Sequence, residues 1–346
     1  MEQDPAKAID AYRSALALNP HNALALLELA GAYQVTGDEA QQGAMLQRAI
    51  EADPYNPDVR WEAGLFFLLR GDADNGLRQF QAVVHAHPER TRSAFQLAWR
   101  AAHDVRRIMD TVNPSTTTAY AALLQVVIDD KQPEAAALVW NRWTALNQRF
   151  APQLAFPYID FLLAQHQPEN AQRVWTYVAQ FSPEIRSRSS FGNLVLNGGF
   201  EEDLLNGGMD WRYSPAGATS IQLDSTHFHG ANRSLKIIFR ADSTDAGIVQ
   251  YIPVQPNTSY SFSGYIKGEE LLTAYGPRFG IYDAYTNTPL LLTDDIIGTV
   301  AWAPRTGSFK TGPETKLLAL RLVRESGHIR GKVWIDDLQI RLTPPR

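Results

Sequence analysis

The sequence predicts two domains, an all-α solenoid of helical repeats followed by an all-β sandwich. Prolines recur every 34 residues at Pro20, Pro54 and Pro88, as expected of stacked helical pairs. Apolar residues keep helical spacing to about residue 182, whereas from residue 193 short runs alternate apolar and polar residues between turns, as strands do. At 346 residues the chain also exceeds what one hydrophobic core usually covers.

The composition excludes several classes of function. A formal net charge of -5 gives no basic excess, which argues against nucleic acid as the main partner. The chain has no cysteine, so disulfides, thiol catalysis and cysteine-ligated zinc are excluded. No stretch is long and apolar enough to cross a bilayer, and no signal peptide pattern opens the chain. We therefore expect no direct membrane span in this chain.

Several residue types share the 34-residue period. Gly37 and Gly71 keep it, and Tyr12, Leu46 and Phe80 place a large apolar residue at equal intervals. Between Ala23 and Pro54 the pattern resembles a tetratricopeptide repeat, and the residues that carry the resemblance are Leu26, Leu29, Ala30, Tyr33, Gly37, Leu46, Ala49 and Pro54. It departs from the family at Gln42, Arg60 and Gly76. The resemblance implies a tetratricopeptide-type domain over residues 1–182.

The first repeat is incomplete. Residues 4–20 supply only a second helix, which leaves the apolar residues Ala8, Ile9 and Tyr12 without a partner helix. We expect either a truncated chain or an end that packs on another subunit or a lost segment. The periplasm or cell envelope is favoured if the chain belongs to a longer protein, and the localisation is otherwise unknown.

Residues 183–192 are polar and predict a short linker before the second domain. Strands are then expected at 234–239, 248–254, 259–267, 278–282, 317–323 and 333–342. The stretch Asn193 to Glu202 predicts a first strand bent at a turn. Together with Trp211 and residues 229–236, 254–267 and 333–340, this stretch resembles the galactose-binding-like jelly roll. The closest resemblance is to carbohydrate-binding modules of the family 4, 9 and 22 type; it spans nearly all of residues 193–343 and implies such a domain over residues 193–346.

The resemblance implies one structural calcium ion where the first strand meets the last. The expected ligands are carboxylates of Glu201, Asp336 and Asp337 and backbone carbonyls around His229 and Asn232. Calcium prefers several oxygen ligands, and the acidic residues come from opposite ends of the domain. The alternative is that these are solvated acidic residues in a turn.

Strand alternation predicts a glycan-binding surface. In the run 259–267, Tyr260, Phe262 and Ile266 share one face, which we interpret as core, so Tyr265 and Lys267 point outward. The same argument directs Gln250, Arg278, Tyr282 and Arg321 away from the core. Aromatic platforms beside hydrogen-bonding groups suit sugar rings, although such residues are also normal on any solvated sheet.

In the helical domain, an apolar groove is expected along Leu24, Leu27, Gln34, Asp58, Trp61, Leu65 and Leu68. Such a groove would bind an apolar helix of a protein partner. The alternative is that these residues pack against neighbouring helices.

No nucleophile elbow or phosphate-binding loop is present, so we predict no enzymatic activity. We predict a non-catalytic scaffold whose repeats dock a protein and whose sandwich binds a glycan, as in a bacterial envelope or exopolysaccharide system. The alternatives are a pure protein-interaction adaptor with a structural jelly roll, and a fragment of a larger membrane-bound polysaccharide enzyme. The sequence does not identify the sugar, the protein partner or the oligomeric state.

Overall fold

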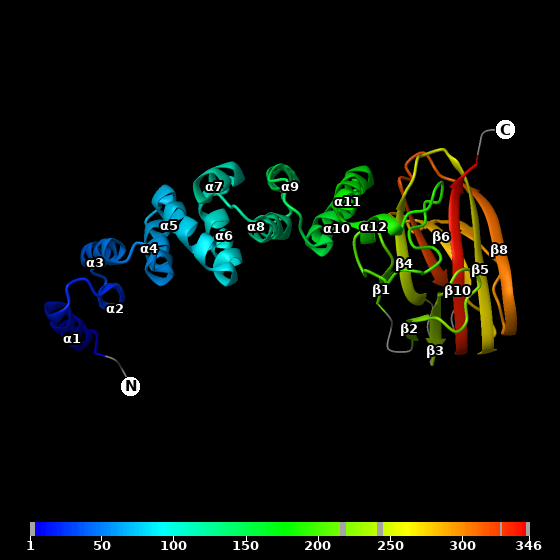
Figure 1. Ribbon diagram of the computed structural model, residues 1–346, viewed down its shortest axis with the longest axis horizontal. Helices are drawn as coiled ribbons and strands as arrows, with labels where there is room; N and C mark the ends of the chain where they lie inside the picture. The colour runs from blue at the N-terminus through cyan, green and yellow to red at the C-terminus, as the bar shows by residue number, and fades with distance from the viewer. Residues whose placement is uncertain (1–3, 215–218, 241–244, 326, 344–346) are drawn as a thin grey trace. The chain divides into compact units, whose positions relative to one another are not determined.

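The computed structural model describes residues 4–214, 219–240, 245–325 and 327–343. The chain divides into two compact units, residues 1–150 and residues 151–346. The first unit is helical, and the second carries further helices and a β-sandwich (Figure 1). A helical part followed by a β-sandwich is therefore confirmed. None of the helices in the described ranges has the length and apolar character needed to span a membrane.

The helices of the first unit are α1 (Pro5–Leu18), α2 (Ala23–Thr36), α3 (Glu39–Ala52), α4 (Pro57–Leu69), α5 (Ala73–Ala86), α6 (Pro88–Ala102), α7 (Val105–Val112), α8 (Thr117–Asp129) and α9 (Pro133–Ala145). The residues that recur every 34 positions lie at helix ends. Asp4, Asp38 and Asp72 cap the N-termini of α1, α3 and α5, each accepting a backbone N–H bond on its side chain. Gly37 and Gly71 follow α2 and α4 in the left-handed conformation, with φ of 75° and 78°. Helical repeats explain these marks, and their tetratricopeptide type stays a prediction.

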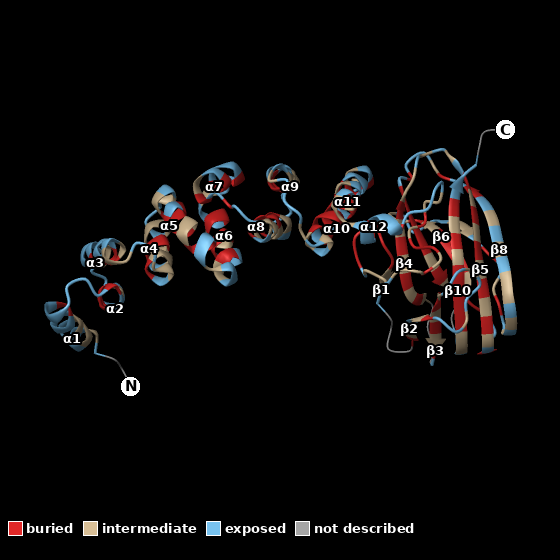
Figure 2. Ribbon diagram, viewed as in Figure 1, coloured by how far each residue is buried: buried red, intermediate tan, exposed pale blue. Residues whose placement is uncertain are grey.

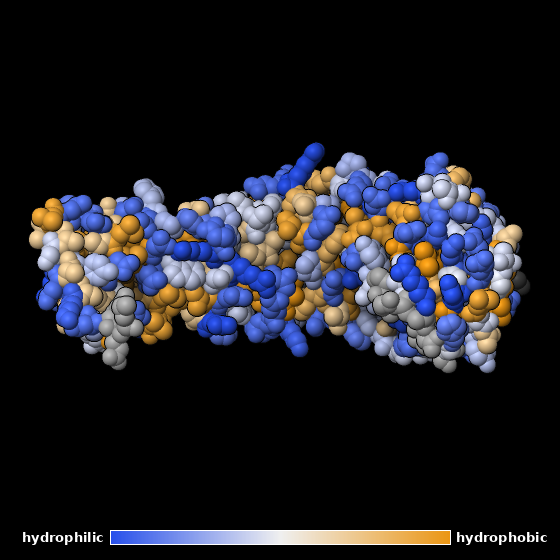
Figure 3. Space-filling view, turned by 90° about the horizontal axis from the view of Figure 1, so that it is seen from below, coloured by the Kyte–Doolittle hydropathy of each residue, from blue (hydrophilic) through white to orange (hydrophobic). Residues whose placement is uncertain are grey.

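The residues of the expected groove do not share one environment. Leu24, Gln34 and Asp58 are exposed, whereas Leu27, Trp61, Leu65 and Leu68 are half-buried. The Trp61 ring lies 5.5 Å from that of Phe80 on α5, between centroids. Packing between helices thus accounts for part of the set. On the face seen in Figure 3, hydrophobic patches of the helical unit lie between hydrophilic ones.

The second unit begins with the 3-10 helix η1 (Pro152–Ala155) and the helices α10 (Phe156–Ala164), α11 (Pro168–Phe181) and α12 (Pro183–Ser187). Its strands are β1 (Arg212–Tyr213), β2 (Thr219–Asp224), β3 (Ser234–Phe239), β4 (Asp245–Pro253), β5 (Ser259–Leu272), β6 (Arg278–Asp283), β7 (Pro289–Leu292), β8 (Gly298–Lys310), β9 (Leu317–Val323) and β10 (Arg330–Leu342). Two antiparallel sheets result. Sheet A has the order β1-β4-β9-β6-β7, and sheet B has the order β2-β3-β10-β5-β8.

The core of the sandwich lies between the two sheets. Buried and less buried residues alternate along β4 and β5, and buried positions recur in both sheets (Figure 2). Tyr260, Phe262 and Ile266 are at most 2% exposed, so their predicted core positions are confirmed. Burial of one face of each sheet fixes which side chains remain outside.

The predicted first strand is wrong, because residues 193–202 form turns. Isolated backbone hydrogen bonds join this stretch to β10. The Leu194 N–H donates to the Ile340 carbonyl (2.9 Å), and the Gly198 carbonyl accepts from the Leu338 N–H (2.9 Å). The left-handed conformations of Asn197 and Phe200 (φ of 48° and 56°) prevent a continuous ladder between these contacts.

Helices α10 to α12 pack on the sandwich in part through three consecutive residues, 210–212. Asp210 pairs with Arg188, which follows α12, and Arg212 pairs with Asp160 of α10. Trp211 between them is 1% exposed. This contact explains why the second compact unit begins at Ala151, although the sequence places residues up to 182 with the helical domain. Part of the expected linker, residues 183–187, is α12.

Candidate functional site

The structure does not bring the six predicted glycan-binding residues together. Arg278 and Tyr282 lie on β6 and Arg321 lies on β9, all in sheet A. Tyr265 and Lys267 lie on β5 in sheet B. Both groups alternate with core residues, so they occupy the two outer faces on opposite sides of the sandwich.

Gln250 is a correction to the predicted orientation. Its side chain is 0% exposed, between Ile248 and Ile252 on the core side of β4. Its amide accepts from the Leu196 N–H (2.9 Å) and donates to the Leu196 carbonyl (2.8 Å). The side chain therefore forms the hydrogen bonds of the Leu196 backbone that a neighbouring strand would otherwise form. Its spacing of two residues from both isoleucines was the signal for this orientation.

The same inversion turns Tyr251 outward, a residue that the sequence interpretation missed. On sheet A, Tyr251 and Tyr282 both pair in register with Ala319 on the strand between them. Each ring carries a guanidinium group. The Arg212 Cζ lies 5.5 Å from the Tyr251 centroid, and the Arg321 Cζ lies 5.6 Å from the Tyr282 centroid. The outer face of sheet A thus holds two aromatic side chains with cationic neighbours.

Polar partners hold Arg321 and a further arginine of this face, Arg278, in place. Arg321 donates from Nη1 to the Asn287 Oδ1 (3.2 Å), and Arg278 pairs with Glu325 (3.2 Å between Nη2 and Oε1). Burial raises the pKa of Asp245 on β4, and the nearby charge of Arg321 opposes that rise. Fixed donors and acceptors beside aromatic rings are able to bind hydroxyl groups without prior rearrangement.

On the outer face of sheet B, the protein's own side chains cover the aromatic residues. The His229 ring stacks on Tyr265, with centroids 3.5 Å apart. Trp334 is 1% exposed, with the Nζ atoms of Lys236 and Lys267 at 5.1 and 5.0 Å from its centroid. His229 therefore covers one face of the Tyr265 ring, and Trp334 is buried.

Asp224 anchors Trp334 from β2. Its Oδ2 accepts from the indole Nε1 at 2.8 Å. Burial alone would raise the pKa of Asp224, but hydrogen bonds from Thr226 and Trp334 and the charge of Lys236 hold it well below its usual range. This carboxylate stays ionised and keeps the indole in place.

The structure does gather the residues predicted to bind calcium. Asp336 is 0% exposed, and its Oδ2 accepts from the backbone N–H groups of His229 (2.8 Å) and Gly230 (3.1 Å). Burial raises the pKa of Asp336 to about 6, against the lowering effect of these bonds. Asp337 pairs with the His229 ring at 2.6 Å.

Glu201 binds the same loop from the other end of the domain. Its Oε1 accepts from the backbone N–H groups of Asn232 and Arg233, each at 3.0 Å. Glu201 therefore contacts the loop 229–233 through backbone N–H groups, where backbone carbonyls were predicted. Within the described residues, however, no group of three or more His, Asp or Glu side chains is arranged so that it holds a metal ion. Calcium itself stays a prediction.

Residues 192–325 match the family model described as a carbohydrate binding domain. The C-terminal region therefore carries a carbohydrate-binding domain, which is a non-catalytic module, and the match does not extend into the first unit. A comparison with curated proteins gives no match.

Three solved structures illustrate the similarity. The first is TmCBM61 in complex with beta-1,4-galactotriose, with 16% identity over 44% of this chain and 99% of that chain and a TM-score of 0.34. The second is the CBM22-1 xylan-binding domain of Paenibacillus barcinonensis Xyn10C, with 19% identity, coverages of 43% and 94% and a TM-score of 0.28. The third comprises the CBM22-1-GH10 modules of a Clostridium thermocellum endo-1,4-beta-D-xylanase complexed with xylohexaose. There the identity is 14%, the coverages are 39% of this chain and 26% of that chain, and the TM-score is 0.30.

Proposed function

We propose that the sandwich is a non-catalytic glycan-binding module and that the outer face of sheet A is its binding surface. The observation that carries the proposal is the match of residues 192–325 to a carbohydrate binding domain. The position of the surface is supported by Tyr251 and Tyr282, which flank Ala319 on adjacent strands. On sheet B, His229 stacks on Tyr265 and Trp334 is buried, while Trp302 of β8 is half-buried beside His229.

The chemistry of this face suits a sugar chain. One side of a pyranose ring is rich in C–H groups and packs on an aromatic ring, while the hydroxyls at its edge exchange hydrogen bonds with charged side chains. Tyr251 and Tyr282 supply the rings. Arg278 and Arg321 supply donors that are already held by Glu325 and Asn287. Because these groups are fixed beforehand, little ordering entropy is lost on binding.

We infer that the helical unit is a scaffold that docks a protein. Exposed apolar side chains on its helices support this, with Leu24 57% exposed and Val35 74% exposed on α2. The alternatives are an adaptor with a structural sandwich and an accessory fragment of a larger polysaccharide enzyme. Glycan binding by sheet A separates the first alternative from our proposal.

We expect the full chain to bind at least one neutral oligosaccharide on a glycan array. Tyr251→Ala and Tyr282→Ala should each weaken that binding by about tenfold, because each removes one stacking platform. The matched control is Tyr55→Ala, since Tyr55 is 87% exposed in the helical unit and should not affect binding. No binding to any glycan at millimolar concentration would contradict the proposal, as would equal binding by all three variants.

We further propose that one calcium ion joins Glu201, Asp336 and Asp337. The support is the donor chemistry, since three carboxylates from distant parts of the domain gather at one loop. Binding requires these side chains to rearrange, because they do not converge as they stand. The ion would offset the repulsion between the carboxylates and tie the start of the domain to its last strand.

Calcium at a hundredfold excess over its Kd should then stabilise the folded chain by about 2.7 kcal/mol, and a chelator should reverse the effect. Thermal unfolding in calcium and in chelator measures this. Glu201→Gln should reduce the shift. Identical melting curves in the two conditions would overturn the calcium proposal and leave the glycan proposal untouched.

A further inference from the structure

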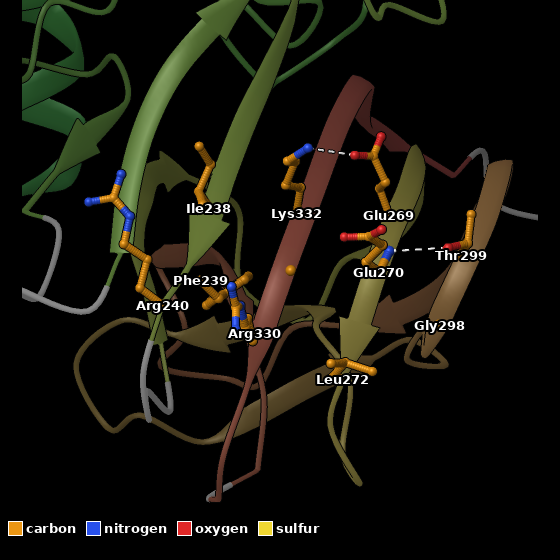
Figure 4. A pocket seen from close by; sticks show the side chains of 11 residues that line it. Ile238, Phe239, Arg240, Glu269, Glu270, Leu272, Gly298, Thr299, Arg330 and Lys332 are labelled. Atoms are coloured by element: carbon orange, nitrogen blue, oxygen red, sulfur yellow. Dashed lines mark hydrogen bonds and ion pairs between the residues drawn. The ribbon is translucent and has the colours of Figure 1, made fainter.

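A pocket of about 930 Å³ opens at the end of sheet B where β3 finishes and β10 begins (Figure 4). None of the residues predicted from the sequence to bind a ligand lines it. Its charged lining residues come from β5, from β10 and from the residue after β3, and they are Arg240, Glu269, Glu270, Arg330 and Lys332. Thr299 of β8 adds a hydroxyl, which accepts a bond from the Glu270 N–H (3.1 Å).

The backbone around this pocket is irregular on two neighbouring strand pairs. The pairing of β10 with β5 shifts between Arg330 and Lys332, and the pairing of β5 with β8 shifts between Gly268 and Leu271. At the shift, Glu270 has a φ of 53°, which is unusual for a residue with a side chain. Such bulges redirect side chains. Here both Glu269 and the following Glu270 line the same pocket.

Gly331 allows the two strands to approach at this bulge. Its φ is 133°, and a Cβ atom there would lie 2.5 Å from the Glu270 carbonyl oxygen. Any other residue would push β10 away from β5. The shape of the pocket therefore depends on a specific backbone arrangement.

Cations outnumber anions around the pocket. Lys332 and Glu269 pair at 2.5 Å between Nζ and Oε1 and neutralise each other. Arg240 and Arg330 are exposed, and neither guanidinium has a hydrogen-bond or ion-pair partner among the described residues. The described lining residues carry three positive and two negative side chains, counting Glu270, so the pocket has a net positive charge in a chain whose net charge is -5.

We propose that this pocket is a second saccharide site, selective for sugar units that carry a negative group such as a carboxylate, sulfate or phosphate. Arg330 binds the anion with its guanidinium group, and the exposed Arg240 side chain, which points away from Arg330 in Figure 4, turns to contact the same group. Glu270 and Thr299 accept or donate bonds to hydroxyls of the same sugar. That the ligand of this pocket is a saccharide rests on the proposed function. The position of the pocket and its preference for a negative group do not depend on sheet A.

The test is a calorimetric titration of the full chain with tetragalacturonic acid and, separately, with the neutral oligosaccharide found on the array. Arg240→Ala combined with Arg330→Ala should weaken binding of the uronate by about tenfold to a hundredfold. Binding of the neutral oligosaccharide should not change. The matched control is Arg341→Ala, an exposed arginine at the other end of β10. Raising the salt concentration should weaken only uronate binding.

Each outcome decides a separate point. Uronate binding that survives the double substitution, or that is lost in Tyr282→Ala, would overturn the second site and leave the proposed function standing. Displacement of the uronate by inorganic sulfate at equal ionic strength would show an anion site without saccharide selectivity, which also overturns it. If neutral sugars bind and the uronate does not, only the second site fails. If neither binds, both proposals fail.

Discussion

Replacing Asp210 by alanine should lower the free energy of unfolding by about 3–5 kcal/mol. Arg188 and Asp210 form an ion pair at 2.8 Å between Nη1 and Oδ2, and their side chains are 1% and 0% exposed. The substitution leaves the buried guanidinium group with only its longer ion pair to Glu184, at 3.4 Å between Nη2 and Oε1. Asp210 also accepts the Leu205 N–H at 2.9 Å, so a backbone donor loses its partner as well.

Urea unfolding followed by tryptophan fluorescence measures this loss. The control is Asp203→Ala, because Asp203 forms an ion pair with Arg233 at 2.9 Å but is 87% exposed, so its loss should cost less than about 1 kcal/mol. Arg188→Met combined with Asp210→Leu should recover most of the stability by replacing the pair with apolar contacts. Equal effects of Asp210→Ala and Asp203→Ala would contradict the account of α12 docked on the sandwich.

The second large effect is expected for Trp211→Ala, which should cost about 3–5 kcal/mol. The Trp211 ring is 1% exposed and lies 5.3 Å from that of Phe200, between centroids. Its Nε1 donates to the Asn197 carbonyl at 3.2 Å. Because residues 193–202 have few backbone bonds to the sheets, this indole is a main anchor of that stretch.

Differential scanning calorimetry tests the effect of Trp211→Ala against Phe191→Ala. Phe191 is 100% exposed, and its removal should change the unfolding free energy by less than about 0.5 kcal/mol. Trp211→Phe should retain part of the stability, since it keeps the ring contact and loses only the hydrogen bond. A melting temperature of Trp211→Ala equal to that of Phe191→Ala would show that the stretch is held in another way.

The expected ranges correspond to six of the ten strands in the described residues, and β1, β2, β7 and β8 have no counterpart among them. Strands β3 and β9 begin and end where alternation places them, at Ser234–Phe239 and Leu317–Val323. The assignment of faces was correct on β5, where Tyr260 and Phe262 mark the core. It failed on β4, because Gln250 is polar yet faces inward, where its amide replaces a missing strand partner of Leu196.

The arrangement of the site was not accessible from single strands. β5 and β6 follow each other in the chain, yet they belong to different sheets. Tyr265 and Tyr282 therefore point to opposite sides of the sandwich, although both are correctly placed as outward residues. Which sheet a strand joins depends on contacts between distant segments, and a local period of two residues does not record them.

The pocket on sheet B was missed for a related reason. A left-handed φ at Glu270 and a shift of register at Gly331 do not appear in any alternation of residue types. Glu201, Asp336 and Asp337 were placed at the same loop because a resemblance to known modules supplied the proximity of distant segments. Long-range information of this kind is what the strand patterns lack.

Isothermal titration of the array-selected oligosaccharide into the full chain and into the Tyr251→Ala, Tyr282→Ala double variant measures whether sheet A binds a glycan through these two tyrosines. Melting temperatures are recorded for both proteins. We predict that the double variant melts within a few degrees of the parent chain and binds about a hundredfold more weakly. A double variant that is folded and binds with the parent affinity would contradict the claim.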